Sequence, residues 1–256
     1  MKYIYKLSII LFSVFTFIGC NVDDDDQMTD LPLKDLTAAF QMQTAIIAVP
    51  DNATSYDLVI DFSQGLPSYS SIEYSLDGAA STSVSASTGD TSVTIPVAFA
   101  ATDNFHDVDL SDFIVVNSQA RRFSPSIVGN TTVRIMREGY FSAKMTWTTN
   151  QDLDLDLDVM TSSWTWSGST LDSSAGITNE ENVGALLADG NHALYVFEWP
   201  SNSFSNPVDI TFEVVTAGGN YMTTINAQEY GWQLWFTKST DVDGNVSYTF
   251  YEEDPS

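Results

Sequence analysis

The residues with the clearest capacity for chemistry are four aspartates that alternate with apolar residues between Gln151 and Met160. The alternation has the period of a β-strand, which places the two kinds of residue on opposite faces. The apolar members are Leu153, Leu155, Leu157 and Val159, and the acidic members are Asp152, Asp154, Asp156 and Asp158. Carboxylates in that register lie about 6.5–7 Å apart and repel one another. The acidic face is therefore either solvated or part of a calcium site, since calcium binds carboxylate oxygens in irregular geometry.

A second candidate site consists of Trp164 and Trp166, which are two positions apart and are expected on one face of a strand. Exposed, the two indoles could stack on sugar rings. Buried, they would belong to the core or fill the gap between two sheets, which is the commoner fate of tryptophan. The sequence leaves both interpretations open.

Other motifs give no support for an enzyme. The segment 241–245 begins like a calcium loop, but Asp-Gly-Asn between two strand-like runs is explained more simply by a hairpin turn. His106 and His192 are the only histidines, which is too few for a histidine zinc site or a nearby catalytic triad. The chain has no GxSxG motif and no glycine-rich phosphate loop. We therefore expect a non-catalytic protein.

Short runs rich in Val, Ile, Thr, Tyr and Phe recur between turn-forming residues along most of the chain, which is typical of strands. The predicted fold class is all-β, with two β-sandwich domains in series. An immunoglobulin-like sandwich is expected over 36–135 and a second β-sandwich over 136–256. The segments 36–46 and 179–187 show weak helical signals, each enough for a turn or two.

The second domain also carries a family resemblance. A tryptophan-bearing segment, Met145–Asn150, leads into the acidic strand, and Leu171-Asp172, Gly176 and Asn179–Asn182 follow it. This order resembles the DLDLHV-type β-sandwich domains of bacterial secreted proteins, which are related to pre-peptidase C-terminal domains. The resemblance covers about 136–256 and implies a jelly-roll-like sandwich that serves as an accessory or binding module, with acidic residues that hold calcium in some relatives. By position, the implied calcium ligands are Asp154, Asp156, Asp172 and Glu180.

The N-terminus is typical of an exported lipoprotein. Lys2 and Lys6 precede the apolar run Leu7–Ile18, and the following Gly19-Cys20 resembles a lipobox. This predicts a signal peptide over 1–19 and a lipid on Cys20, which is the only cysteine. Segment 20–35 is expected to be an acidic tether, and its Asp23–Asp26 run resembles the surface-export signal of lipoproteins in the Bacteroidota. An ordinary cleaved signal peptide with a free cysteine, or an uncleaved anchor, are the alternatives.

The charge balance restricts the partners. The chain has 34 Asp+Glu against 9 Lys+Arg, for a net charge of −25, which repels phosphate backbones and makes nucleic acid an unsuitable partner. We expect an outer-membrane lipoprotein at the cell surface, attached to the membrane through Cys20. It would act as a binding or adhesion module for an extracellular glycan or protein, with calcium as a cofactor. The alternatives are a structural or assembly lipoprotein of the envelope and a carbohydrate-binding component of a polysaccharide-utilisation system.

Overall fold

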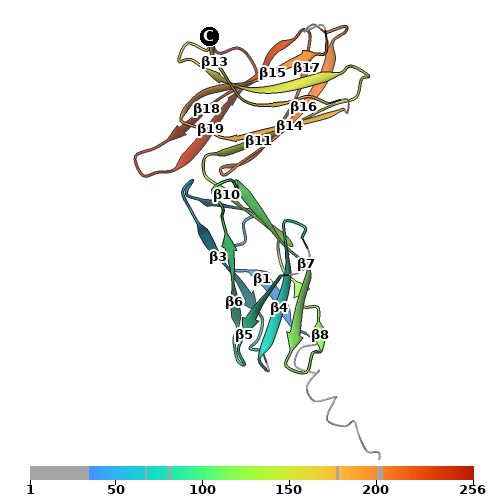
Figure 1. Ribbon diagram of the computed structural model, residues 1–256, viewed down its shortest axis with the longest axis vertical. Helices are drawn as coiled ribbons and strands as arrows, with labels where there is room; N and C mark the ends of the chain where they lie inside the picture. Colours follow the sequence, from blue (N-terminus) through green and yellow to red (C-terminus); the bar gives the residue numbers. More distant parts are fainter. Residues whose placement is uncertain (1–34, 67, 80–81, 177–178, 201–203) are drawn as a thin grey trace, which may run out of the picture. The chain divides into compact units, whose positions relative to one another are not determined.

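The computed structural model describes residues 35–256 except 67, 80–81, 177–178 and 201–203 (Figure 1). The predicted signal peptide, Cys20 and nearly all of the predicted tether lie outside the described residues. Every regular element in the described part is a β-strand, so the all-β prediction is confirmed. The helical turns expected over 36–46 and 179–187 are wrong, because those segments form strands. No described segment forms a helix of the length and hydropathy that a membrane crossing requires.

The N-terminal half consists of two sheets. The first has the order β6-β3-β1-β9, and the second has the order β2-β10-β7-β4-β5, with β8 also paired to β7. The strands are β1 Thr37–Phe40, β2 Ile46–Val49, β3 Ser55–Phe62, β4 Ser70–Leu76, β5 Thr82–Ala86, β6 Ser92–Ala98, β7 Phe105–Asn117, β8 Arg122–Phe123, β9 Ser126–Ile127 and β10 Thr132–Arg137. The pairs β1–β3, β4–β5 and β7–β8 are antiparallel, whereas β1–β9 and β2–β10 are parallel. Alternate residues of the longer strands are buried, as a two-sheet core requires.

The C-terminal half consists of two further sheets, both antiparallel. Sheet C has the order β14-β11-β16-β17, and sheet D has the order β13-β12-β15-β18-β19. The strands are β11 Tyr140–Trp147, β12 Leu153–Met160, β13 Trp166–Ser174, β14 Glu180–Leu186, β15 Gly190–Glu198, β16 Val208–Thr216, β17 Gly219–Ala227, β18 Gly231–Thr240 and β19 Val246–Tyr251. Segment 241–245 closes the β18–β19 hairpin, so the turn prediction is confirmed: the Asp241 backbone N–H donates to Asn245 O at 3.0 Å.

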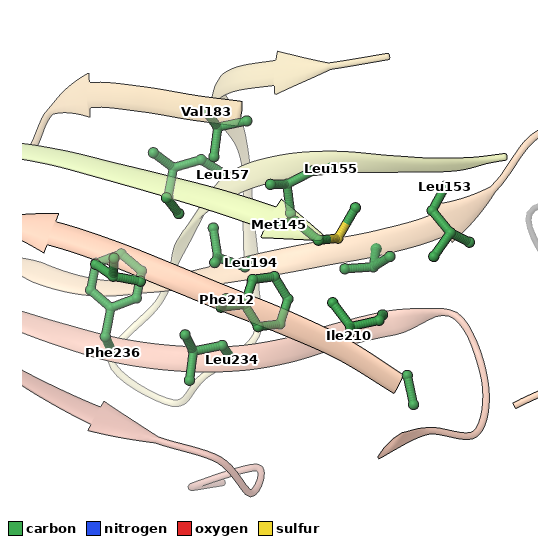
Figure 2. Packing of buried hydrophobic residues seen from close by; sticks show 14 of the residues in the cluster. Met145, Leu153, Leu155, Leu157, Val183, Leu194, Ile210, Phe212, Leu234 and Phe236 are labelled. Atoms are coloured by element: carbon green, nitrogen blue, oxygen red, sulfur yellow. The ribbon is translucent and has the colours of Figure 1, made fainter. Parts of the chain in front are cut away.

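The core between sheets C and D explains why the acidic strand folds where it does. Leu153, Leu155 and Leu157 of β12 are fully buried and pack with Phe212 and Phe236 from β16 and β18 (Figure 2). Burying one leucine side chain contributes about 1.5–3 kcal/mol, so three leucines in register fix which face of β12 points inward. Val159 is only half-buried and lies outside this cluster. The aspartates of β12 consequently lie on the outer face of sheet D.

The chain divides into two compact units, and the division does not coincide with the sheets. The second unit contains Thr132–Ser256 together with Thr44–Asp57 and Pro96–Val108, and the first contains the intervening segments. Strands β3, β6 and β7 each pass from one unit to the other. The predicted domain boundary at 135/136 lies within β10, near the end of that strand. It does not coincide with the limits of the two units, and it stays a prediction.

Candidate functional site

The outer face of sheet D is covered with aromatic side chains rather than open to solvent. Its second apolar cluster contains Met160, Ala193 and Trp235, and Trp164, Trp232 and Tyr251 pack against it. Asp154 and Asp158 on the same face are each only 5% exposed. Neither side chain belongs to a simple solvated face, which was one of the two interpretations that the sequence left open.

Beside this cluster lies a pocket of about 300 Å³, lined by residues from four neighbouring strands. Its lining residues are Asp156 and Asp158 of β12, Trp166 and Thr170 of β13, Tyr195 of β15, and Trp232 of β18. Cross-strand register explains how they meet: Asp156 lies opposite Tyr195, and Tyr195 lies opposite Trp232. The backbone hydrogen bonds of sheet D therefore fix the positions of the pocket-lining residues relative to one another.

Sheet D has register shifts beside this pocket, and two of them account for Trp232 and Thr170. Leu194 pairs with Leu234 and Tyr195 pairs with Trp232, so Gln233 is an extra residue in β18. Because Leu234 points into the core, simple alternation would also turn Trp232 inward. The bulge turns Trp232 to the outer face, as bulges beside binding sites commonly re-aim a side chain.

A second bulge lies across from the acidic strand. Leu157 pairs with Asp172 and Asp158 pairs with Thr170, which leaves Leu171 as the extra residue. Thr170 thereby faces Asp158 on the outer side, and its Oγ1 donates to Asp158 Oδ1 at 2.6 Å. Strand periodicity alone predicts neither bulge, so Thr170 and Trp232 could not be identified as site residues from the sequence.

The two pocket carboxylates differ in their partners. Asp158 accepts from Thr170 through one oxygen and from Trp232 Nε1, at 3.0 Å, through the other. Asp156 has no hydrogen-bond donor among the described residues. Burial, followed by the charges of Asp158 and Asp154, raises the pKa of Asp156 to about 6. Asp156 thus carries a negative charge at neutral pH that the protein leaves uncompensated.

The predicted tryptophan pair is separated by the structure. Trp164 and Trp166 are not on one strand, because Trp164 lies in the β12–β13 turn with φ of 60° and β13 begins only at Trp166. Trp164 is half-buried and contacts Tyr251 edge-on, with ring centroids 5.4 Å apart. Trp166 is 52% exposed and lines the pocket. Each of the two interpretations of the pair thus fits one residue.

The four predicted calcium ligands lie in three places. Asp154 and Asp156 share the outer face of sheet D. Asp172 lies opposite Leu157, and its Oδ2 accepts from the Gly184 backbone N–H at 2.7 Å. Glu180 is exposed and forms an ion pair with Lys144 at 2.8 Å. Nowhere in the described chain do three or more His, Cys, Asp or Glu side chains form a group arranged to hold a metal ion.

A different set of carboxylates gathers where β12 and β14 begin. Glu181, the neighbour of the predicted Glu180, is 3% exposed, and its Oε2 accepts from Ser174 Oγ. Its Oε1 and Asp152 Oδ1 are buried without a hydrogen-bond partner among the described residues. Burial raises the pKa of Asp154, and the charges of Asp152 and Glu181 raise it further, against a lowering by the Gly176 backbone N–H. The described residues therefore supply fewer hydrogen-bond donors than these carboxylates have buried oxygens.

Comparisons with known proteins give no family. No family model matches the sequence, and no curated protein matches it. One similar solved structure is the crystal structure of the apo form of the Calx CBD1 domain, at 13% identity and a TM-score of 0.26, with 41% of this chain and 96% of that chain covered. Another is CBD12 from CALX1.2, at 14% identity and a TM-score of 0.25, with 70% and 80% covered. TM-scores this low transfer neither a site nor a function to this chain.

Proposed function

We propose that the protein is a lipid-anchored, non-catalytic binding module of the cell surface, and that its C-terminal sandwich binds a glycan in the pocket on sheet D. One observation carries the proposal: an exposed indole, Trp166, and the carboxylate of Asp156 line the same pocket. Aromatic rings pack against the C–H faces of sugar rings, and carboxylates accept hydrogen bonds from sugar hydroxyls.

The size of the site favours a small ligand over a protein partner. A pocket of about 300 Å³ is at the lower end of the range for small-molecule sites and accommodates one or two sugar rings. A specific protein partner would need about 800 Å² of surface on each side, and the pocket alone does not offer it. Binding without catalysis also fits Asp158, because both of its oxygens already accept hydrogen bonds within the protein.

Glycan-array binding tests the proposal. Trp166→Ala should abolish binding of the glycans that the unaltered protein retains. Trp199→Ala is the matched control, since Trp199 is 60% exposed and does not line the pocket. The proposal fails if no glycan binds, or if the two variants lose binding equally.

Calcium binding is a second candidate property. The described carboxylates are not arranged as a formed metal site, but buried oxygens of Asp152 and Glu181 lack a partner near Asp154, whose pKa their charges raise. Unpartnered buried carboxylate oxygens are costly, and a divalent cation would compensate them. These residues would supply hard oxygen ligands, and their negative charge matches the cation. A cation bound there would connect the start of β12 with the start of β14.

Thermal unfolding in chelator and in excess calcium tests this second property, since a ligand of the folded state raises the melting temperature. Calcium should stabilise the unaltered protein and Glu180→Gln, but not Glu181→Gln. Glu180 is the matched control because it is exposed and paired with Lys144. An unchanged melting temperature in all three proteins would exclude a stabilising calcium site, and a loss confined to Glu180→Gln would move the site to the residue predicted from the sequence.

The anchor is proposed from the sequence alone. Metabolic labelling with a fatty acid should mark the protein and should not mark Cys20→Ser. Cleavage by protease added to intact cells would support surface exposure. Full protection of a labelled protein would favour the alternative of a structural lipoprotein inside the envelope.

A further inference from the structure

The pocket on sheet D holds more negative charge than its own residues compensate. Asp156 and Asp158 both line it, and no lysine or arginine does. Asp158 is stabilised by Thr170 and Trp232, whereas Asp156 has no donor among the described residues. A ligand that brings a positive charge would therefore gain more than a neutral ligand of the same shape, because it relieves repulsion that exists before binding.

The remaining lining suits a cation on a carbon skeleton rather than a bare metal ion. Trp166, Tyr195 and Trp232 surround the carboxylates, and aromatic faces attract ammonium groups, tryptophan most strongly. Calcium, by contrast, requires several oxygen ligands, and the pocket supplies only two carboxylates and the hydroxyls of Thr170 and Tyr195. Of these oxygens, those of Asp158 already accept hydrogen bonds.

We propose that the pocket selects an amino sugar whose amine is free and protonated, with the ammonium group donating to Asp156 and the sugar ring packed against Trp166. This inference rests on the proposed function, since it names the ligand class of the same site. A neutral sugar offers only hydroxyl donors to Asp156, and an N-acetylated sugar offers an uncharged amide. Every hydrogen bond to the Asp156 carboxylate is charge-assisted by the acceptor, but only the ammonium group adds the attraction between two opposite charges, so the free amine decides the preference.

The titratable groups around Asp156 are all acidic among the described residues. Asp154 and Asp158 lie on its own strand and Tyr195 lies on β15. Strands β13 and β18 contribute only uncharged lining, namely Trp166, Thr170 and Trp232.

Titration calorimetry with the full chain and three trisaccharides tests the inference: the glucosamine trimer, the N-acetylglucosamine trimer and cellotriose. At neutral pH the glucosamine trimer should bind at least about tenfold more tightly than either neutral trimer. Asp156→Asn should remove this preference. Asp209→Asn is the control for general attraction to an acidic surface, because Asp209 lies on β16 outside the pocket lining.

The outcomes separate this inference from the proposed function. Equal binding of all three trimers, lost in Trp166→Ala, would overturn the amino-sugar assignment and leave glycan binding in place. Binding of the glucosamine trimer that Asp156→Asn and Asp209→Asn weaken equally would show surface attraction and overturn it as well. Putrescine binding as tightly as the glucosamine trimer would overturn the sugar part. If no trimer binds, both proposals fail.

Discussion

Trp232 Nε1 donates to Asp158 Oδ2 at 3.0 Å across 74 positions of sequence, and this bond connects the two halves of the candidate site. Asp158 belongs to β12 at one side of the pocket, and Trp232 belongs to β18 at the other, with β15 between them. The bond depends on the bulge at Gln233, which turns the indole outward. It compensates a carboxylate that is only 5% exposed.

Replacing Trp232 by Phe should therefore cost stability beyond the lost ring area. Asp158 would keep only the Thr170 donor, and a buried charged acceptor that loses one partner costs about 1–3 kcal/mol. Urea unfolding measures this difference. Trp166→Phe is the control, because Trp166 is 52% exposed, and it should change the unfolding free energy by less than about 0.5 kcal/mol. Equal losses in the two variants would refute a stabilising role for the bond.

Asp156→Asn should stabilise the protein at neutral pH. The pKa of Asp156 is raised from 3.8 to about 6 in the folded state, so between these values the folded chain binds more protons than the unfolded chain. The unfolding free energy therefore falls as the pH rises through that window. A shift of this size corresponds to about 3 kcal/mol at most, and solvent access reduces the expected gain to about 1–2 kcal/mol at pH 8. Urea unfolding at about pH 8 and pH 4 should show the gain only at the higher value. A variant less stable than the unaltered protein at pH 8 would contradict the charge argument.

The strands with strong alternation were predictable, and the site was only partly so. Leu153, Leu155 and Leu157 are buried as the period of two requires, because three leucines on one face leave β12 no other register. Strand β14 was not predicted, because segment 179–187 shows a weak helical signal. In the structure the Asn179 side chain instead donates to Trp147 O at 3.1 Å. That bond attaches the start of β14 to the neighbouring strand, β11.

Within the site, local pattern identified the acidic residues but not their surroundings. Asp156 could be placed on the outer face from alternation. What covers that face depends on Tyr195 and Trp232, which come from strands distant in sequence. Tyr195 does alternate with buried Leu194 and Val196, so an aromatic on the outer face of β15 was a usable signal. No pattern in the sequence indicates the bulges at Leu171 and Gln233, because one extra residue in a strand does not change its composition noticeably.

Leu155→Ala should be much more damaging than Val159→Ala, although the sequence predicts both side chains on one face. Leu155 is fully buried in the core of sheets C and D, and truncation there typically costs about 2–5 kcal/mol. Val159 is half-buried outside that core, so its truncation should cost about 1 kcal/mol or less. Urea unfolding of the two variants measures the ratio. Similar losses would mean that Val159 belongs to the core after all.

The ion pair between Lys238 and Asp189 should contribute measurably to the free energy of unfolding, unlike a typical exposed ion pair. Lys238 is 5% exposed, and its Nζ lies 2.8 Å from Asp189 Oδ1. Asp189 also accepts from the Thr240 backbone N–H at 2.9 Å and from its hydroxyl at 2.8 Å. Asp189→Ala would leave a buried ammonium group without its counter-charge. The expected loss is about 1–3 kcal/mol, below that of a fully buried pair because 48% of the Asp189 side chain is exposed.

A double-mutant cycle and a pH series separate the charge from the packing of this pair. Lys238→Met in the Asp189→Ala background should recover most of the loss, since it removes the buried charge and keeps the apolar stem. In the unaltered protein, the hydrogen bond from Lys238 is the main reason that the pKa of Asp189 is lowered, followed by the bonds from Thr240. The stabilisation is therefore present above the ordinary pKa of an aspartate and is lost as the pH falls below it. Asp189→Ala should show no such loss on acidification from this site, so the two unfolding curves should converge at low pH. Curves that stay parallel down to about pH 2 would assign the effect of Asp189 to packing instead of charge.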